Sequence, residues 1–206
     1  MTLHAIETRY AGHRFRSRLE ARWAVFFDTL DIKWQYEPQG FVIPRADGST
    51  TPYLPDFLLP DCGTWIEVKG NDTDLDHALM TDAALHLPAN ATGEQGPNLM
   101  LLGPIPEPRI GDWGWLGLSR VWDENNQTTE VWDQWWGFGG YVKSGRPWAL
   151  TETSTSTPYV VGEGAHSWVE PAHDATIPYP SRHAYEAARS ARFEHGEQRA
   201  FNQPHS

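Results

Sequence analysis

The first seventy residues predict a mixed α/β fold, because one amphipathic helix is followed by short strands and tight turns. Ser17 and Glu20 form a capping-box signature, so we expect the helix to run from residue 17 to about residue 30. Two short apolar segments, at residues 53–59 and Thr64–Val68, flank a turn and are typical of paired strands. The apolar positions that give the helical spacing are Phe15, Leu19, Trp23, Phe26 and Leu30.

In the rest of the chain the local patterns predict further helices, strands and turns. A helix over residues 73–87 is expected to be capped by Thr73, and Gly196 is expected to close the last helix. The remaining expectations are strands at 32–37, 40–44 and 98–102, a hairpin turn at 46–49, two or three strands over 111–150 around Asn125-Asn126, a Ser/Thr linker at 151–157 and a helix at 181–196. We therefore expect a core of residues 1–110 and a Trp-rich, β-containing acidic extension of residues 111–206, which could pack onto the core as one domain.

Composition excludes several classes of protein. No run approaches the ~18 consecutive apolar residues of a membrane span, and one cysteine, Cys62, excludes a disulfide framework. The first ten residues lack the apolar core of a signal peptide, so a cytoplasmic location is expected. The net charge of −11 is uneven: residues 1–70 carry eight Lys or Arg against nine Asp or Glu, and the rest carry eight against eighteen. The acidity therefore lies in residues 71–206, and a protein partner could recognise this acidic part of the chain.

Three residues in the two apolar segments carry chemistry. On a strand, Glu67 and Lys69 project from one face, and pairing through the turn brings Asp56 to the same edge. Two adjacent carboxylates repel each other, and a divalent cation removes that cost. We therefore expect Asp56 and Glu67 to hold Mg2+ or Mn2+, with the carbonyl of Val68 as a further ligand. Lys69 would orient the attacking water or neutralise developing charge.

The same residues resemble a known family. The runs Tyr53-Leu54-Pro55-Asp56-Phe57 and Trp65-Ile66-Glu67-Val68-Lys69 are similar to the core motif of the PD-(D/E)XK nuclease superfamily. The upstream runs Arg16-Ser17-Arg18-Leu19-Glu20 and Tyr36-Glu37-Pro38 resemble its first helix and strand, most closely in transposon-end-cleaving and phage or mobile-element endonucleases. The resemblance covers about residues 9–102. It implies a restriction-endonuclease-like sheet flanked by helices, and it adds Glu20 to the metal site.

Each candidate also has a structural interpretation. Asp56 could simply form a turn, Glu67 and Lys69 could form an ion pair, and the capping box alone accounts for Glu20. Arg18 and Arg22, one turn apart on the first helix, could contact nucleic-acid phosphates or pair with nearby acids.

The aromatic and basic residues of the second half are similarly open. Eight of the eleven tryptophans lie between residues 113 and 168, where they could form a core or stack on unpaired bases. In the last helix, Arg182, Arg189, Arg192 and Arg199 could follow a phosphate backbone or form an ordinary charged surface.

The leading hypothesis is an enzyme, an Mg2+- or Mn2+-dependent nuclease that hydrolyses phosphodiester bonds in DNA. Its catalytic residues would be Glu20, Asp56, Glu67 and Lys69. The alternatives are an inactive nucleic-acid-binding module of the same fold and an acidic protein-interaction factor.

Overall fold

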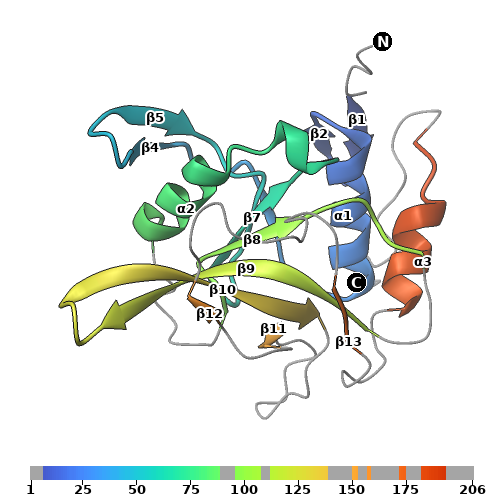
Figure 1. Cartoon of the computed structure of the whole chain (residues 1–206). Helices are drawn as coiled ribbons and strands as arrows, with labels where there is room; N and C mark the ends of the chain where they lie inside the picture. The colour runs from blue at the N-terminus through green and yellow to red at the C-terminus, as the bar shows by residue number, and fades with distance from the viewer. Residues whose placement is uncertain are drawn as a thin grey trace.

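The computed structural model describes residues 7–88, 96–107, 112–138, 150–152, 157–158, 172–174 and 182–193. Within these ranges the elements follow the chain in the order drawn in Figure 1. They are β1 Thr8–Tyr10, β2 His13–Phe15, α1 Arg18–Thr29, β3 Gln35–Tyr36, β4 Phe41–Pro44, β5 Thr50–Tyr53, β6 Phe57–Leu59, β7 Thr64–Val68, a 3-10 helix Asp72–Asp74, α2 His77–His86, β8 Leu99–Leu102, β9 Asp112–Asp123, β10 Thr128–Phe138, β11 Leu150–Glu152, β12 Thr157–Pro158, β13 Ala172–Asp174 and α3 Arg182–Ser190.

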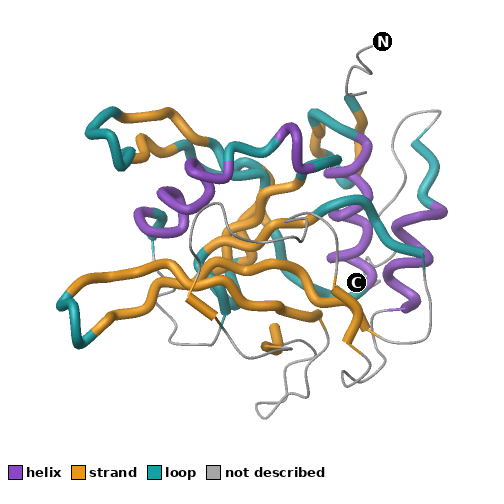
Figure 2. The backbone as a smooth tube through the Cα atoms, in the orientation of Figure 1, coloured by secondary structure: helices purple, strands orange, loops and turns teal. Residues whose placement is uncertain are grey.

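Nine of the described strands form one sheet, which confirms the mixed α/β class. The order is β11-β10-β9-β8-β7-β6-β3, with β12 beside β10 and β13 beside β9. The pair β7–β8 is parallel and the other pairs of this sheet are antiparallel. A parallel pair requires a crossover connection, and the segment between these two strands contains α2. Figure 2 shows the long β9–β10 hairpin extending past the helices.

Helices and a hairpin cover both faces of the central strands. One apolar cluster joins Ile66 of β7 to α1 and α3, and a second joins Trp65 to α2 and the β4–β5 hairpin. Figure 1 shows α1 and α3 side by side on one flank of β7 and β8, with α2 and the hairpin on the other. Because both faces are covered, all residues of β7 and β8 are buried, the charged Glu67 included.

The first helix forms as its sequence predicts. Ser17 is the N-cap, and its side chain accepts a hydrogen bond from the backbone N–H of Glu20. The helix ends before Asp31, which adopts the left-handed conformation at φ 56. Trp23, Phe26 and Phe27 are fully buried, so the apolar face of α1 is packed against the sheet and α3.

Several predicted boundaries are wrong by a few residues. The helix expected at 73–87 begins at His77 with Asp76 as its cap, because residues 72–74 form a separate 3-10 turn capped by Asn71. The last helix ends at Ser190, well before Gly196. The strand expected at 32–37 is limited to β3.

Two further segments differ from the prediction. The strand expected at 53–59 is broken between β5 and β6. In the expected linker, residues 151–152 and 157 belong to β11 and β12, while residues 153–156 lie outside the described segments.

The tryptophans divide between core and surface. Trp115 and Trp136 are buried, and Trp115 stacks edge-to-face on Trp23 of α1 at 5.0 Å. Trp122 is 59% exposed, so the core interpretation holds for some of these rings and not for this one. Trp136 is packed inside, so Trp135 and Trp136 do not form an exposed stacking pair. The side chains of Trp113, Trp148 and Trp168 are not among those that the structure describes.

None of the helices in the described ranges is long and apolar enough to cross a membrane.

Candidate active site

The two predicted carboxylates lie opposite each other at the end of the β6–β7 pair. Asp56 immediately precedes β6, and because Phe57 pairs with Ile66, the same register brings Asp56 opposite Glu67. Directly opposed residues have Cβ atoms about 4.5–5.5 Å apart. The side chain of Asp56 reaches β7, where Oδ2 accepts a hydrogen bond of 2.7 Å from the backbone N–H of Val68. Both acids are buried, at 1% and 5% exposure.

A break in the strand positions Asp56. Pro55 has no N–H to donate, and β5 ends two residues before it at Tyr53. The carbonyl of Asp56 accepts a hydrogen bond of 2.9 Å from the backbone N–H of Glu37, just beyond β3. The backbone of Asp56 is therefore held by the β3 side of the sheet and its carboxylate by β7.

Glu67 is held from two directions. Lys69, two residues along the chain, places Nζ 2.7 Å from Glu67 Oε1. Tyr53 at the end of β5 donates its hydroxyl to Glu67 Oε2 at 2.8 Å. Burial raises the pKa of Tyr53 well above its usual 10.0, and the Glu67 charge raises it further, so the hydroxyl stays protonated as a donor. Burial alone would lower the pKa of Lys69, but Glu67 raises it, which keeps the ammonium charged.

Glu20 joins this group from the first turn of α1. Its Oε1 accepts from Ser17 Oγ at 2.7 Å, and its Oε2 accepts from the backbone N–H of Arg16 and from the Tyr36 hydroxyl at 2.6 Å. Glu20 is therefore both the partner of the helix cap and a buried charge. It also acts electrostatically on Asp56, so its carboxylate belongs to the same cluster.

Arg16 is the principal residue of the site that sequence reasoning left without a role. Its Nη2 lies 2.7 Å from Asp56 Oδ1. Its Nε lies 2.6 Å from Glu37 Oε1, but these two groups are not aligned for a hydrogen bond. Burial lowers the pKa of Arg16, but Asp56 and the other carboxylates raise it beyond its usual range. The available signal was the run of closely spaced arginines, Arg14, Arg16, Arg18 and Arg22, around the capping box.

Glu37 is the second such residue. It adopts a left-handed conformation at φ 43 although it is not glycine, and backbone strain of this kind concentrates at functional sites. Tyr36 contacts Glu20 and Tyr53 contacts Glu67. Both tyrosines belong to the motif runs, but the sequence predicts no role for either. Side-chain contacts of this kind depend on which strands pair, so the sequence alone could not show them.

The electrostatics of the cluster suit a hard cation. Burial raises the pKa of Asp56 well above 3.8, and the charges of Glu67 and Glu20 raise it further; the Val68 N–H and Lys69 act in the opposite direction. In the described part of the chain, no group of three or more His, Cys, Asp and Glu side chains is arranged to hold a metal ion. Two carboxylates and a main-chain carbonyl are nevertheless the donors that Mg2+ takes, since it keeps several waters. The donor set at Asp56, Glu67 and Val68 fits such an ion.

Arg18 and Arg22 lie elsewhere. On a helix of 3.6 residues per turn they share one face of α1, roughly 200° around the axis from Glu20. Both line a separate cavity at the end of α3. The structure therefore brings Glu20, Asp56, Glu67, Val68 and Lys69 together and places these two arginines outside the cluster.

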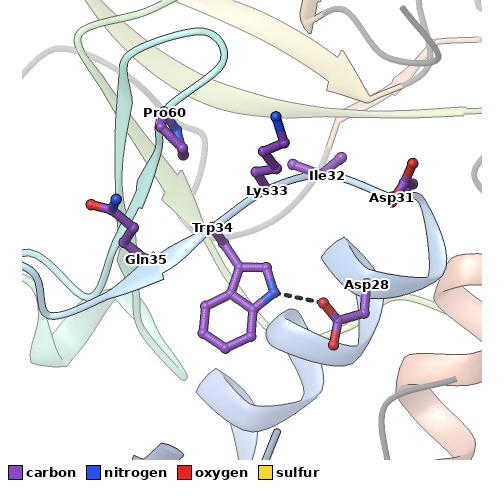
Figure 3. Close-up of a pocket in the computed structure, with 7 residues that line it drawn as sticks. All are labelled: Asp28, Asp31, Ile32, Lys33, Trp34, Gln35 and Pro60. Carbon is purple, nitrogen blue, oxygen red and sulfur yellow. Dashed lines mark hydrogen bonds between the residues drawn. The ribbon is translucent and has the colours of Figure 1, made fainter. Parts of the chain in front are cut away.

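A second cavity, of about 450 Å³, lies beyond the C-terminal end of α1 (Figure 3). Figure 3 shows the Trp34 ring directed at Asp28, with the Nε1–Oδ1 hydrogen bond of 2.8 Å, while Lys33 points away from them. The other oxygen of Asp28 accepts from the Tyr10 hydroxyl at 2.8 Å. Among the described residues that line this cavity, the only other carboxylate, that of Asp31, is exposed, so the cavity lacks the pair of buried, opposed carboxylates of the Asp56 cluster.

Comparison of the chain with models of protein families, with functionally characterised proteins and with solved structures finds no significant match. The geometry of the site and the resemblance of its motifs are therefore the two indications of function.

Proposed function

We propose that the protein is a divalent-metal-dependent nuclease with a restriction-endonuclease-like core of the PD-(D/E)XK type, and that it hydrolyses phosphodiester bonds in DNA. The observation that carries the proposal is the placement of Asp56 opposite Glu67, both buried, with Lys69 bound to Glu67. Opposed buried carboxylates repel each other, which a bound cation would offset, and a carboxyl with a raised pKa, such as Asp56, is typical of functional sites.

In this proposal each residue has a distinct task. Asp56, Glu67 and the Val68 carbonyl hold Mg2+ or Mn2+, and Glu20 adds negative potential to the site. The ion, when bound, supplies an acidified water and neutralises charge on the reacting phosphate. Lys69 holds its proton, because Glu67 raises its pKa, so it acts as a fixed cation that orients water and offsets developing negative charge. Arg16, 55% exposed, can turn toward a substrate phosphate.

The test compares cleavage by the full chain and matched variants. Linear, circular, single-stranded and branched DNA would be incubated with Mg2+, Mn2+ or chelator. Asp56→Asn and Glu67→Gln should each reduce cleavage below detection, because each removes a charge that holds the ion. Asp61→Asn is the control, since Asp61 is exposed in the turn between the same two strands and pairs with Lys33.

A second pair of variants tests the lysine. Lys69→Met should slow cleavage by about 10²-fold or more while the affinity for Mn2+ is retained. Lys33→Met, at an exposed lysine, is its control. If Asp56→Asn and Glu67→Gln cleave as fast as the wild type, the proposal is wrong. If the wild type binds DNA and cleaves none of the four substrates with either metal, the chain is an inactive binding module instead.

A further inference from the structure

A second charged feature lies between α1 and the end of α3. A cavity of about 350 Å³ is lined there by four arginines, with Ser190 and Phe193 beside them. We refer to it as the arginine cleft, defined by Arg18, Arg22, Arg189 and Arg192. None of the described residues that line it is acidic. This is a concentration of positive charge in a protein whose net charge is −11.

Two of these arginines have no partner among the described residues. Arg18 is exposed and Arg22 is half-buried, and neither forms an ion pair or a hydrogen bond with another residue of those segments. The Nε of Arg22 is buried without an acceptor. A partly desolvated guanidinium without an acceptor costs free energy, and an anion in the cleft would offset that cost at the part of Arg22 that is accessible. No described residue therefore supplies an anion to Arg18 and Arg22.

The walls of the cleft are preformed. Arg189 donates to the carbonyl of Ile105 at 3.3 Å and to Glu107 at 3.2 Å, which holds its guanidinium in place. Between the helices, the Tyr185 ring packs on Phe26 at 4.5 Å, and Phe193 packs on Tyr10 at 6.2 Å. The backbone segments that carry the arginines, in α1 and at the end of α3, are thus packed against each other, so only the side chains need to be ordered on binding.

The ligand chemistry follows from the side chains. Guanidinium groups donate to phosphate oxygens in pairs, and four of them in one cavity exceed what a single phosphate requires. Because the rest of the protein is acidic, attraction of a polyanion must be local to such a surface. We infer that the arginine cleft binds backbone phosphates of the polynucleotide substrate, away from the phosphate that is cleaved. This inference rests on the proposed nuclease function.

The test measures binding without cleavage. Fluorescence anisotropy of a labelled DNA duplex in chelator would be recorded over a series of salt concentrations for the wild type and Arg18→Gln/Arg22→Gln. The double variant should bind several-fold more weakly, and the slope of log affinity against log salt should fall by about one per phosphate contact removed. Lys33→Gln, in the cavity of Figure 3, should leave both unchanged. Competition with inorganic phosphate distinguishes a polynucleotide site from a simple anion site.

Each result decides the matter. Unchanged affinity and salt slope in the double variant overturn the inference, and so does displacement of the duplex by millimolar inorganic phosphate alone. If the double variant melts early, Arg192→Gln, beyond the end of α3 and exposed, provides the same comparison. If these variants cleave DNA and bind it as tightly as the wild type does, the inferred role of the cleft is wrong and the nuclease proposal stands. If DNA binding depends on the cleft but no metal-dependent cleavage occurs, the nuclease proposal is wrong and the cleft is still a DNA-binding site.

Discussion

The guanidinium of Arg16 binds the carboxylate of Asp56, with Nη2 2.7 Å from Oδ1, across forty residues of chain. The other oxygen of Asp56 accepts from the Val68 N–H. Both oxygens of a proposed metal ligand are therefore occupied by donors in the protein without metal. A divalent ion would have to compete with Arg16 for Oδ1, so the arginine sets how readily the site accepts an ion.

Removing this competitor should tighten metal binding. Arg16→Met is expected to lower the Kd for Mn2+ several-fold, as measured by titration calorimetry, because the carboxylate loses its built-in counter-charge. Arg14→Met is the control, since Arg14 is exposed and pairs with Glu7. Weaker or unchanged Mn2+ binding in Arg16→Met would mean that the arginine does not compete with the ion.

The raised pKa of Asp56 predicts a pH-dependent stability. Folding shifts Asp56 toward its neutral form relative to the unfolded chain, because of burial and the charges of Glu67 and Glu20, so the stabilising contribution of the neutral form is present below pH 3.8 and is lost as pH rises through the raised pKa. In chelator at pH 7, Asp56→Asn should therefore melt at a higher temperature than the wild type, and the difference should shrink toward pH 4. Mg2+ should reduce this difference in melting temperature at pH 7, because it stabilises only the wild type. A lower melting temperature for Asp56→Asn in chelator contradicts this reasoning.

The two roles of Glu20 can be separated by two substitutions. Glu20→Gln keeps an acceptor for Tyr36 and Arg16 and should cost about 1 kcal/mol of unfolding free energy or less. Glu20→Ala leaves those donors unsatisfied and should cost about 1–3 kcal/mol. Because Glu20 acts electrostatically on Asp56, Glu20→Gln should also weaken metal binding, so that excess Mn2+ partly restores cleavage. Full cleavage by Glu20→Gln at low Mg2+ would limit Glu20 to capping.

The aromatic core gives a direct stability test. Trp115 is fully buried, and its Nε1 donates to the Tyr185 hydroxyl at 3.0 Å. Trp115→Ala should therefore lower the unfolding free energy by about 3–5 kcal/mol. Trp122→Ala is the matched control on the same strand, and its exposed ring predicts a change within about 0.5 kcal/mol. Equal effects of the two substitutions in chemical denaturation would contradict the division between core and surface.

Local patterns predicted the helix cap and the second strand of the site well, whereas the strand expected at 53–59 is broken between β5 and β6. The Ser17–Glu20 capping box is formed, and β7 has the predicted bounds of Thr64–Val68, because both depend on neighbouring residues. Where two local capping signals compete, prediction was poorer. The helix expected from residue 73 begins only at His77, since Asn71 and Asp76 each cap a turn of their own.

The partners of the site residues were beyond the reach of the sequence. Arg16 contacts Asp56 only because β3 and β6 pair and bring the start of α1 to the same edge. Likewise, the sequence left open whether Arg18 and Arg22 contact nucleic-acid phosphates or pair with nearby acids, and helical geometry turns them toward α3. Spacing along a helix gives the face that residues share, and packing decides which element that face meets.

The position of β8 has a consequence for handling the protein. Leu99–Leu102 is entirely buried, with β7 paired on one edge and β9 on the other. A chain shortened after residue 110 would keep the carboxylate cluster and lose β9, which leaves a flat apolar strand with bare N–H and C=O groups. Such edges recruit further strands from other copies, so the shortened chain should aggregate on expression. The segment after residue 110 thus keeps the first half of the protein soluble.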